Sequence, residues 1–450
     1  MSMAKLPIVA IVGRANVGKS SLFNRFLEKR QAIIADKPGT TRDSIYGKVT
    51  RDDRAFWLID TAGLKTPEDE FELSIQDQIT QAAESATMML VVIEHGTGVT
   101  EEDRRVAKMA LKSKKPVVLV VNKADNPRLK DIEEFKRLGI KDIFLTSAEH
   151  NRGIDKLSDF VLNQLPKVKD RSPGANLRLS FIGRPNVGKS SLFNSLLTKQ
   201  KAVVADVAGT TRDVNRQEVN YHGQTIELLD TAGIRRSGKV GKGIEYFSVL
   251  RALAAIEESD ICCLVMDVNE LNTKLDQKIA GMIREAGKGL IIVVSKWDSI
   301  EKDSYTRDGI AKEISREFPF VSWAPLIFTS SETGQNVTKL FDLANGIHDR
   351  RQTTLETKDL NRWLKDVMRH HPPAGLKNKH PNLTYMTQIG GNPPRFKVFG
   401  RDLKYLHWSY KRYMEKEMRE LADFGGTPIE FDFESNSGRT RGKKTVAPKA

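Results

Sequence analysis

The amino-acid sequence predicts an α/β protein with two tandem doubly wound domains, followed by a small α+β module. The first observation is a duplication: GRANVGKS, beginning at Gly13, returns as GRPNVGKS at Gly183, 170 residues later. A second segment, DTAG, begins at Asp60 and again at Asp230, with the same separation. Because the two motifs recur at the same separation, an entire domain has been duplicated. The other observations are an alternation of strand and helix patterns in each copy and a change of pattern after residue 349.

Short Val/Ile/Leu runs alternate with helix-length amphipathic segments in both copies. This alternation predicts parallel strands joined by crossover helices on both faces of a sheet. In the first copy we expect strands near Ile8–Val12, Phe56–Asp60, Met88–Ile93, Val117–Asn122 and Ile143–Thr146. In the second copy we expect them near Leu179–Ile182, Thr225–Asp230, Ile261–Val265, Leu290–Ser295 and Ile327–Thr329.

The C-terminal hundred residues follow a different order of elements. We expect a helix over Lys358–His370, strands over Leu383–Gly390 and Arg395–Phe399, a helix over Lys404–Asp423 and a strand over Pro428–Phe433. This αββαβ order predicts a small α+β module. The expected divisions are a first domain over 1–165, a linker over 166–176, a second domain over 177–349, the module over 350–434 and a disordered basic tail over 435–450.

The composition is that of a soluble globular protein, with 39% hydrophobic and 29% charged residues. No apolar run reaches the roughly 18 residues that span a bilayer, so we expect a cytoplasmic protein with no membrane partner. The adjacent Cys262 and Cys263 lie in an apolar run, which predicts buried strand residues in a reducing compartment. The net charge of +14 favours a polyanionic partner, with a solvated basic surface as the alternative.

Each GxxxxGKS segment predicts a phosphate-binding loop, because its glycines let backbone N–H groups surround a phosphate at the start of a helix. The lysine offsets phosphate charge, and the next serine supplies a hydroxyl to magnesium. The aspartate and the glycine of DTAG are expected beside magnesium and the γ-phosphate. The candidates in the first copy are Gly13, Gly18, Lys19, Ser20, Ser21, Asp60 and Gly63. Those in the second copy are Gly183, Gly188, Lys189, Ser190, Ser191, Asp230 and Gly233.

The identity of the base is predicted by a motif that follows a later strand. The carboxylate of the NKAD segment at 122–125 can accept hydrogen bonds from both donors on the edge of guanine, a pair that adenine lacks. The candidate base-binding residues are Asn122, Lys123, Asp125, Ser147 and Ala148 in the first copy and Ser295, Lys296, Asp298, Ser330 and Ser331 in the second. Ser295 replaces the asparagine and is too short to join the base to the phosphate loop. We therefore expect weaker guanine binding at the second site.

These residues are similar to those of the translation-factor-like GTPases. The tandem arrangement with a small C-terminal module resembles the bacterial Der family of double GTPases, also called EngA, over nearly the whole chain. The resemblance implies two Ras-like P-loop GTPase domains, a KH-like C-terminal domain, and hydrolysis of GTP to GDP with Mg²⁺. It also implies a role in maturation of the large ribosomal subunit, with its rRNA as a partner. We expect a monomer and no DNA partner.

The resemblance also suggests how hydrolysis proceeds without a water-orienting glutamine. Leu64 and Ile234 follow the two DTAG segments, where many small GTPases carry that glutamine. In related GTPases the position of Asn16 and Asn186 helps to coordinate a potassium ion beside the phosphates. The alternative is that these asparagines only brace the loop. The residues that match the switch threonine, which closes onto magnesium and the γ-phosphate, are Thr41 and Thr211.

Charge differs between the segments that follow the two DTAG motifs. The first contains Glu68, Asp69, Glu70 and Glu72, and the second contains Arg235, Arg236, Lys239 and Lys242. The basic segment suits RNA phosphates, which would repel the acidic one, so we expect different partners. The C-terminal module shows no GXXG loop, which KH folds use to hold nucleotides. RNA contact there would depend on Lys377, Lys379, Arg395, Lys397 and the basic face of residues 404–421, and the alternative is a solvated helix face.

Two other functions stay open at this point. The first is a GTP-dependent binding switch or adaptor at a membrane or the division machinery, in which hydrolysis is incidental. Such a protein would bind protein partners without associating with ribosomes. The second is GTP-dependent tRNA modification, which needs a modifying domain that the sequence does not show.

Overall fold

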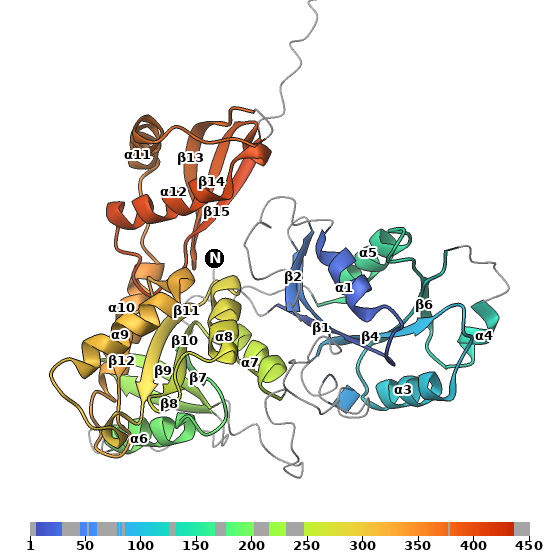
Figure 1. The fold of residues 1–450 in the computed structure, drawn as a ribbon, viewed down its shortest axis with the longest axis horizontal. Coiled ribbons are helices and arrows are strands. Elements are labelled where there is room, and N and C mark those ends of the chain that lie inside the picture. The colour runs from blue at the N-terminus through green and yellow to red at the C-terminus, as the bar shows by residue number, and fades with distance from the viewer. Residues whose placement is uncertain are drawn as a thin grey trace, which may run out of the picture. The chain divides into compact units, whose positions relative to one another are not determined.

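The computed structural model describes residues 6–28, 46–51, 54–60, 79–80, 82, 86–125, 132–166, 177–201, 216–230, 247–376 and 379–435 (Figure 1). The chain divides into two compact units: Met1–Arg351 with Phe424–Pro428, and Gln352–Asp423 with Ile429–Ala450. Most of the predicted linker and nearly all of the predicted tail lie outside the described residues. The predicted domain boundaries stay predictions.

The first repeat folds around a six-stranded sheet with the order β2-β3-β1-β4-β5-β6. Its strands are β1 (Ile8–Val12), β2 (Tyr46–Arg51), β3 (Arg54–Asp60), β4 (Met88–Glu94), β5 (Val117–Asn122) and β6 (Asp142–Leu145). The helices described around it are α1 (Lys19–Glu28), α3 (Glu101–Lys112), α4 (Ile132–Lys136) and α5 (Ile154–Gln164). Helices α1 and α5 cover one face of the sheet, and α3 and α4 cover the other (Figure 1). This is the predicted doubly wound α/β arrangement.

The second repeat has the same topology, with the order β8-β9-β7-β10-β11-β12. Its strands are β7 (Leu177–Ile182), β8 (Arg216–Tyr221), β9 (Gln224–Asp230), β10 (Ile261–Asp267), β11 (Gly289–Ser295) and β12 (Leu326–Phe328). The described helices are α6 (Lys189–Lys201), α7 (Phe247–Glu258), α8 (Lys274–Glu285), α9 (Thr306–Glu317) and α10 (Lys339–Arg351), with short 3₁₀ turns at Trp297–Ser299 and Pro319–Val321. The duplication seen in the sequence is therefore a duplication of fold.

Both sheets are mixed, which corrects the expectation of parallel strands throughout. β2 runs antiparallel to β3, and β8 runs antiparallel to β9. Neither strand was predicted from the sequence, because each lies at a sheet edge and alternates buried and polar residues. In β8, for example, Val219 is buried between the exposed Glu218 and Asn220. Edge strands that face water on one side lack the apolar runs that mark central parallel strands.

The central strands supply the cores of both repeats. All five residues of β1 and all seven residues of β11 are buried, as expected for parallel strands covered on both faces. Cys262 and Cys263 are buried in β10, so the prediction that they are core strand residues is confirmed. Burial raises the pKa of the Cys262 thiol to about 11, which keeps it protonated at neutral pH.

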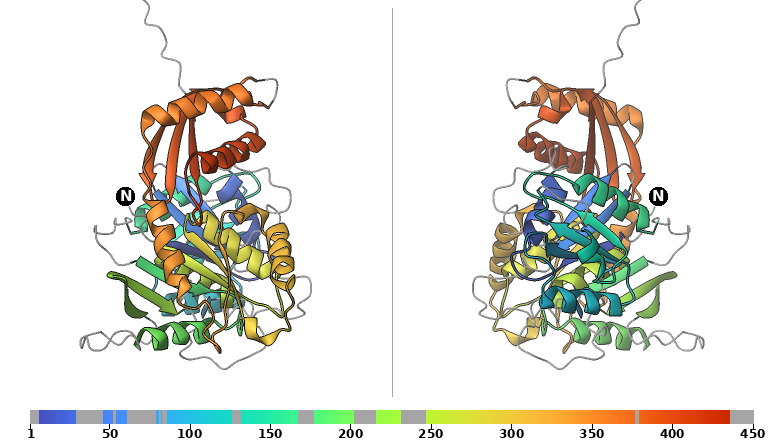
Figure 2. Two further views of the ribbon diagram at one scale, coloured as in Figure 1. Left: turned by 90° about the vertical axis from the view of Figure 1, so that its left-hand side faces the viewer. Right: turned by 90° about the vertical axis from the view of Figure 1, so that its right-hand side faces the viewer.

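The C-terminal unit has the predicted αββαβ order. Its elements are α11 (Thr357–His370), β13 (Asn382–Gly391), β14 (Pro394–Arg401), a 3₁₀ turn at Leu403–Tyr405, α12 (Trp408–Leu421) and β15 (Glu430–Ser435). β14 pairs antiparallel with β13 and parallel with β15, and the two helices pack against these strands (Figure 2). The last helix begins at Trp408 instead of Lys404, because the His407 side chain accepts a hydrogen bond from the Ser409 amide and caps the helix there.

A five-residue segment before the last strand belongs to the first unit. In Phe424–Pro428, the Gly426 amide donates to the Trp323 carbonyl at 2.8 Å, and the Gly426 carbonyl accepts from the Leu290 amide at 2.9 Å. Gly426 has a φ of +79°, and a Cβ there would lie 2.3 Å from the Ile347 side chain. Only glycine meets both conditions, so this close approach to β11 and α10 depends on the residue type.

Candidate functional site

Each GxxxxGKS segment forms a loop between the first strand of its repeat and the following helix, namely between β1 and α1 and between β7 and α6. Gly13 and Gly183 have φ values of +154° and +153°. A Cβ on Gly13 would lie 2.3 Å from the Val92 carbonyl oxygen, and one on Gly183 would lie 2.3 Å from that of Val265. The loop therefore passes so close to the neighbouring strand that only glycine fits.

The lysine of each loop points back into the loop. The Lys19 side chain is buried, and its ammonium donates to the carbonyls of Gly13 at 2.7 Å and Arg14 at 2.5 Å. The Lys189 ammonium donates to the Arg184 carbonyl at 2.5 Å. Both repeats thus hold a positive charge inside a ring of backbone groups at a helix N-terminus, which is the arrangement that phosphate recognition requires.

Two of the three residues predicted to hold magnesium in the first repeat, Ser20 and Asp60, lie together. The Ser20 hydroxyl donates to the Asp60 carboxylate at 2.5 Å, and Asp60 is buried at the end of β3. Hydroxyl and carboxylate oxygens beside a phosphate site are the ligands that Mg²⁺ uses. In the second repeat, Asp230 ends β9 opposite Phe181, as Asp60 ends β3 opposite Ile11. The same backbone register therefore presents both aspartates.

Part of each predicted site lies outside the described residues. This applies to Thr41, Gly63, Thr211 and Gly233 and to the two oppositely charged segments after DTAG. Their roles stay predictions. The loop asparagines are described: both are exposed, and Asn16 has a φ of +63° and Asn186 a φ of +64°. Because asparagine tolerates the left-handed region better than most residues do, these positions have a conformational reason for asparagine as well as the potassium hypothesis.

Asn122 joins three parts of the first site. It is buried at the end of β5, and its amide nitrogen donates to the Val17 carbonyl in the phosphate loop at 3.1 Å. Its amide oxygen accepts from the Ala148 amide at 3.1 Å and from the Thr146 hydroxyl at 3.3 Å. The amide side chain therefore fixes the loop that carries Ser147 and Ala148, which we call the base loop, against the phosphate loop.

Ser295 makes only half of these contacts in the second repeat. It is buried, and its hydroxyl lies 2.6 Å from the Val187 carbonyl and 2.9 Å from that of Met266. Within the described part of the chain, no hydrogen bond joins it to residues 330–331. A Cβ on Gly188 would lie 3.6 Å from the Ser295 hydroxyl, whereas one on Gly18 would lie 2.3 Å from the Asn122 amide. The second site therefore has room for a longer side chain here.

Serine hydroxyls contact the two aspartates that are predicted to recognise guanine, a contact that the motifs alone do not reveal. The Ser147 hydroxyl donates to the Asp125 carboxylate at 2.6 Å, and the Arg152 guanidinium donates to the Asp125 carbonyl at 2.6 Å. In the second repeat, a hydrogen bond from Ser330 lowers the pKa of Asp298. The serine one strand later therefore orients Asp125 in the first repeat and favours the ionised form of Asp298 in the second.

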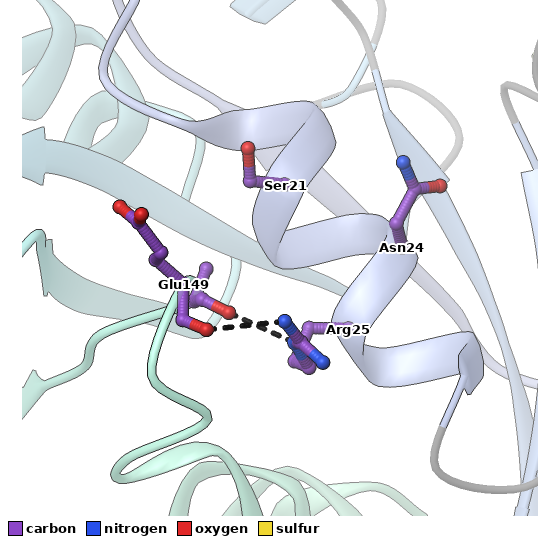
Figure 3. Close-up of a pocket in the computed structure, with 5 residues that line it drawn as sticks. Ser21, Asn24, Arg25 and Glu149 are labelled. Atoms are coloured by element: carbon purple, nitrogen blue, oxygen red, sulfur yellow. Dashed lines mark hydrogen bonds between the residues drawn. The ribbon is translucent and has the colours of Figure 1, made fainter.

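A shallow pocket of about 290 Å³ lies between α1 and the base loop of the first repeat (Figure 3). It is lined by Ser21, Asn24, Arg25, Ala148 and Glu149. Ser21 and Ala148 are predicted nucleotide contacts, so the pocket adjoins the nucleotide site. Arg25 was not identified from the sequence, although GKSSLFNR in the first copy differs from GKSSLFNS in the second only at this residue.

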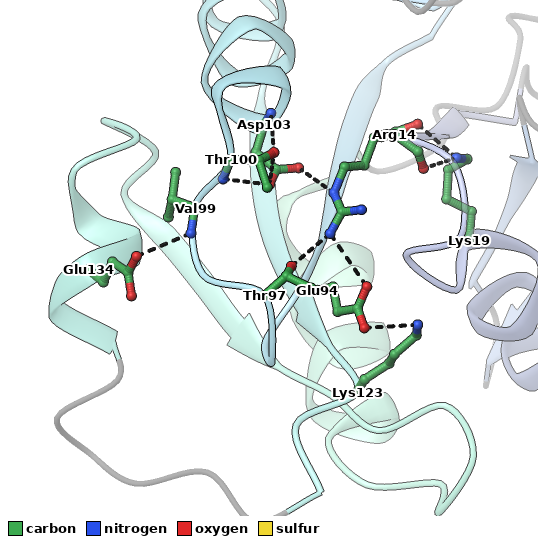
Figure 4. A network of polar contacts seen from close by, with 10 residues as sticks. Arg14, Lys19, Glu94, Thr97, Val99, Thr100, Asp103, Lys123 and Glu134 are labelled. Carbon is green, nitrogen blue, oxygen red and sulfur yellow. Dashed lines mark hydrogen bonds and ion pairs between the residues drawn. The ribbon is translucent and has the colours of Figure 1, made fainter.

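A polar network connects the phosphate loop with Lys123 in the first repeat (Figure 4). The Lys123 ammonium lies 3.1 Å from one oxygen of Glu94, and the Arg14 guanidinium lies 3.4 Å from the other. Arg14 also donates to Thr97 at 2.7 Å and approaches Asp103 at 3.4 Å. A single carboxylate therefore links the residue expected to pack on the base with the loop expected to hold the phosphates.

The second repeat separates these two contacts. Lys296 pairs with Asp267 at 2.6 Å, while Arg184 pairs with Glu270 at 2.8 Å and Asp276 at 3.2 Å. Burial acts to lower the pKa of Arg184, but its bonds to both carboxylates outweigh this and raise it, so the guanidinium stays charged. The sequence contained a signal for the pairing of the loop arginine with an aspartate. Both copies carry an arginine after the first loop glycine and a T-x-x-D helix-capping segment, at 100–103 and at 273–276.

Two basic residues expected to contact RNA in the C-terminal unit are paired with carboxylates. Arg395 donates to Glu430 at 2.7 Å and 2.9 Å, and Lys397 forms an ion pair with Glu434. Helix α12 buries Tyr410, Met414 and Met418 as its core face. Because these ion pairs across β14 and β15 carry no net charge, they provide little attraction for RNA phosphates on this side of the sheet. Lys379 is exposed, and Lys377 lies outside the described residues.

Residues 8–123 and 178–296 match a family model described as "50S ribosome-binding GTPase". Residues 354–434 match one described as "KH-domain-like of EngA bacterial GTPase enzymes, C-terminal". The chain is 43% identical over 442 residues to GTPase Der of Chloroflexus aggregans, covering 95% of this chain and 98% of that protein. It is 41% identical over 425 residues to GTPase Der of Staphylococcus haemolyticus, covering 94% and 98%. Among the described helices, none is long and apolar enough to cross a membrane.

Replacing Ser295 with asparagine is expected to tighten GDP binding at the second site. The new amide would gain an acceptor for the base loop, and one such hydrogen bond is worth on the order of 1 kcal/mol, or about fivefold in Kd. Titration calorimetry of the full chain measures this effect once the first site is silenced with Asp125→Asn. The matched control is Asn122→Ser in a chain with Asp298→Asn, which should weaken the first site. An unchanged Kd for GDP in Ser295→Asn would show that serine at this position already supports GDP binding as well as asparagine does.

Proposed function

The chain belongs to the Der family of GTPases, and from this premise we propose that it hydrolyses GTP at both repeats in support of 50S subunit assembly. The observation that carries the proposal is that each sheet brings a complete phosphate loop and an aspartate predicted to recognise guanine to the carboxyl ends of its strands. Ligands bind at this edge of open α/β sheets. Both repeats have this arrangement, so both are proposed to act on nucleotide.

The described residues support distinct roles in the reaction. Lys19 and Lys189 offset the charge on the β- and γ-phosphates, and the loop amides hold the phosphates at the helix N-termini. Ser20 and Asp60 would hold a magnesium ion, which would neutralise charge that develops on the phosphates. The corresponding residues of the second repeat are proposed to be Ser190 and Asp230. Thr41 and Thr211, with the amides of Gly63 and Gly233, are proposed to close over the γ-phosphate.

Recognition of guanine is proposed to depend on the two aspartates and the residues that hold them. Asp125 and Asp298 accept from the two donors on the guanine edge, while Lys123 and Lys296 pack their stems on the ring. Both lysines have left-handed backbones, with φ values of +60° and +55°, which turns each chain sharply after its strand. The remaining contacts are proposed to come from Asn122, Ser147 and Ala148 in the first site and Ser295, Ser330 and Ser331 in the second.

The partner is proposed to be the large ribosomal subunit and its rRNA. The family model that covers both repeats is described as a 50S ribosome-binding GTPase, and the net charge of +14 favours a polyanion. The basic segment that holds Arg235 and Arg236 is the proposed rRNA contact. We further propose a cytoplasmic monomer. A GTP-dependent adaptor for protein partners is the competing function, and no described feature favours it.

Sedimentation of ribosomal particles with the full chain tests this function. In the presence of a nonhydrolysable GTP analogue, the protein should sediment with large-subunit particles, and GDP should release most of it. The double variant Lys19→Ala/Lys189→Ala is the control, and it should not respond to the analogue. Nucleotide-independent sedimentation, or binding to proteins but not to particles, would favour the adaptor function.

Potassium is proposed to stimulate hydrolysis through Asn16 and Asn186. Turnover in potassium should exceed turnover in sodium at equal ionic strength by about tenfold, the effect of roughly 1.4 kcal/mol of added transition-state stabilisation. The variant Asn16→Gly/Asn186→Gly keeps the left-handed backbone but removes both amides. It should lose the difference between the two salts and retain nucleotide binding. If the glycine variant still prefers potassium, the asparagines serve the loop backbone alone.

A further inference from the structure

Helix α1 contacts the base loop of the first repeat through one side chain. The Arg25 Nε donates to the Ala148 carbonyl at 2.8 Å, and its Nη2 donates to the Glu149 carbonyl at 3.2 Å (Figure 3). The planar guanidinium presents these donors in a fixed fork, so it orients two successive carbonyls at once. Arg25 thereby connects the helix that begins at the phosphate loop with the loop that closes over the base.

The backbone of Ala148 is held through both of its peptide groups. Its amide donates to Asn122 at 3.1 Å, and its carbonyl accepts from Arg25 at 2.8 Å. Ala148 itself is buried. A loop in which two successive peptide groups are fixed has few alternative conformations, so little ordering entropy is lost when a base binds beneath it.

The second repeat lacks both contacts. Ser295 stands in place of Asn122, and Ser195 stands in place of Arg25 at the corresponding position of α6. Among the described residues, no hydrogen bond joins Ser195 to the loop at 330–332. Both loops share their internal bonds: the Ser330 amide donates to the Gln335 carbonyl at 3.2 Å and the Thr333 amide to the Ser330 hydroxyl at 3.0 Å, as the Ser147 amide donates to the Arg152 carbonyl at 3.0 Å and the His150 amide to the Ser147 hydroxyl at 3.2 Å. The second repeat thus differs at both positions whose side chains restrain the base loop in the first repeat.

We propose that Arg25 is a positioning residue that fixes the base loop of the first site and slows the release of guanine nucleotide from that site alone. This inference rests on the proposed binding of guanine nucleotide at both repeats. The first site then retains nucleotide longer than the second. The hydrogen bonds of Arg25 to the Ala148 and Glu149 carbonyls restrain the base loop, so its effect is expected on the lifetime of the bound state.

Arg25 also lies in the last turn of α1, where any cation interacts favourably with the helix dipole. The two roles differ in what they require. A dipole effect needs only positive charge, and Arg25→Lys keeps it. Orientation of the base loop needs the fork, which Arg25→Lys and Arg25→Ser both remove.

The test uses the full chain with the exposed Asp298 replaced by asparagine (Asp298→Asn), so that the second site no longer recognises guanine. Release of a fluorescent GDP analogue is followed after mixing with excess GDP. Arg25→Ser should accelerate release by about tenfold, the effect expected when two charge-assisted hydrogen bonds are exchanged for bonds to water. Arg25→Lys should also release faster than the parent. Arg104→Ser, on the exposed face of α3, is the matched control and should leave the rate unchanged.

Single-turnover hydrolysis at saturating GTP distinguishes positioning from general damage. It should stay within about twofold of the parent for Arg25→Ser, because the phosphate site is unaltered. A release rate that is unchanged in Arg25→Ser, or fully restored in Arg25→Lys, would overturn the inference. If Arg25→Ser fails to fold, the rate for Arg25→Lys decides alone. Absence of guanine nucleotide binding in the unmodified chain would instead contradict the proposed function.

Discussion

The two candidate sites depend on the close approach of each phosphate loop to the neighbouring central strand. A side chain at Gly13 or Gly183 would collide with a strand carbonyl at 2.3 Å, so the loop can take this path only with glycine. This path places the lysine inside the loop and the following serine at the start of a helix. The proposed magnesium ligands and the base loop then meet the phosphate loop because parallel strands end at one edge.

Much of this arrangement could be predicted from the sequence, since repetition and apolar runs report directly on buried parallel strands. β1 and β5 have the predicted bounds, and the C-terminal order of elements is confirmed. The antiparallel edge strands β2 and β8 could not be predicted, because a half-exposed strand carries no continuous apolar run. The break before α12 was missed because His407 is an uncommon helix cap.

The supporting residues of the sites were harder to predict than the motifs. A motif specifies which residues meet the nucleotide, whereas Arg25, Glu94 and Ser147 act through contacts between segments distant in sequence. Comparing the two copies reveals some of them, because a difference such as Arg25 against Ser195 falls within an otherwise identical helix start. Duplicated domains therefore provide an internal control: shared residues mark the common chemistry, and differing residues mark how the two sites diverge.

The central claim is that one chain holds two guanine-nucleotide sites of the same design. Titration calorimetry of GDP with the full chain measures this directly, because binding stoichiometry counts the sites. We expect two GDP molecules per chain, one after either Asp125→Asn or Asp298→Asn, and none when both are changed. A stoichiometry of one in the unmodified chain, or no loss on changing one of the aspartates, would contradict it.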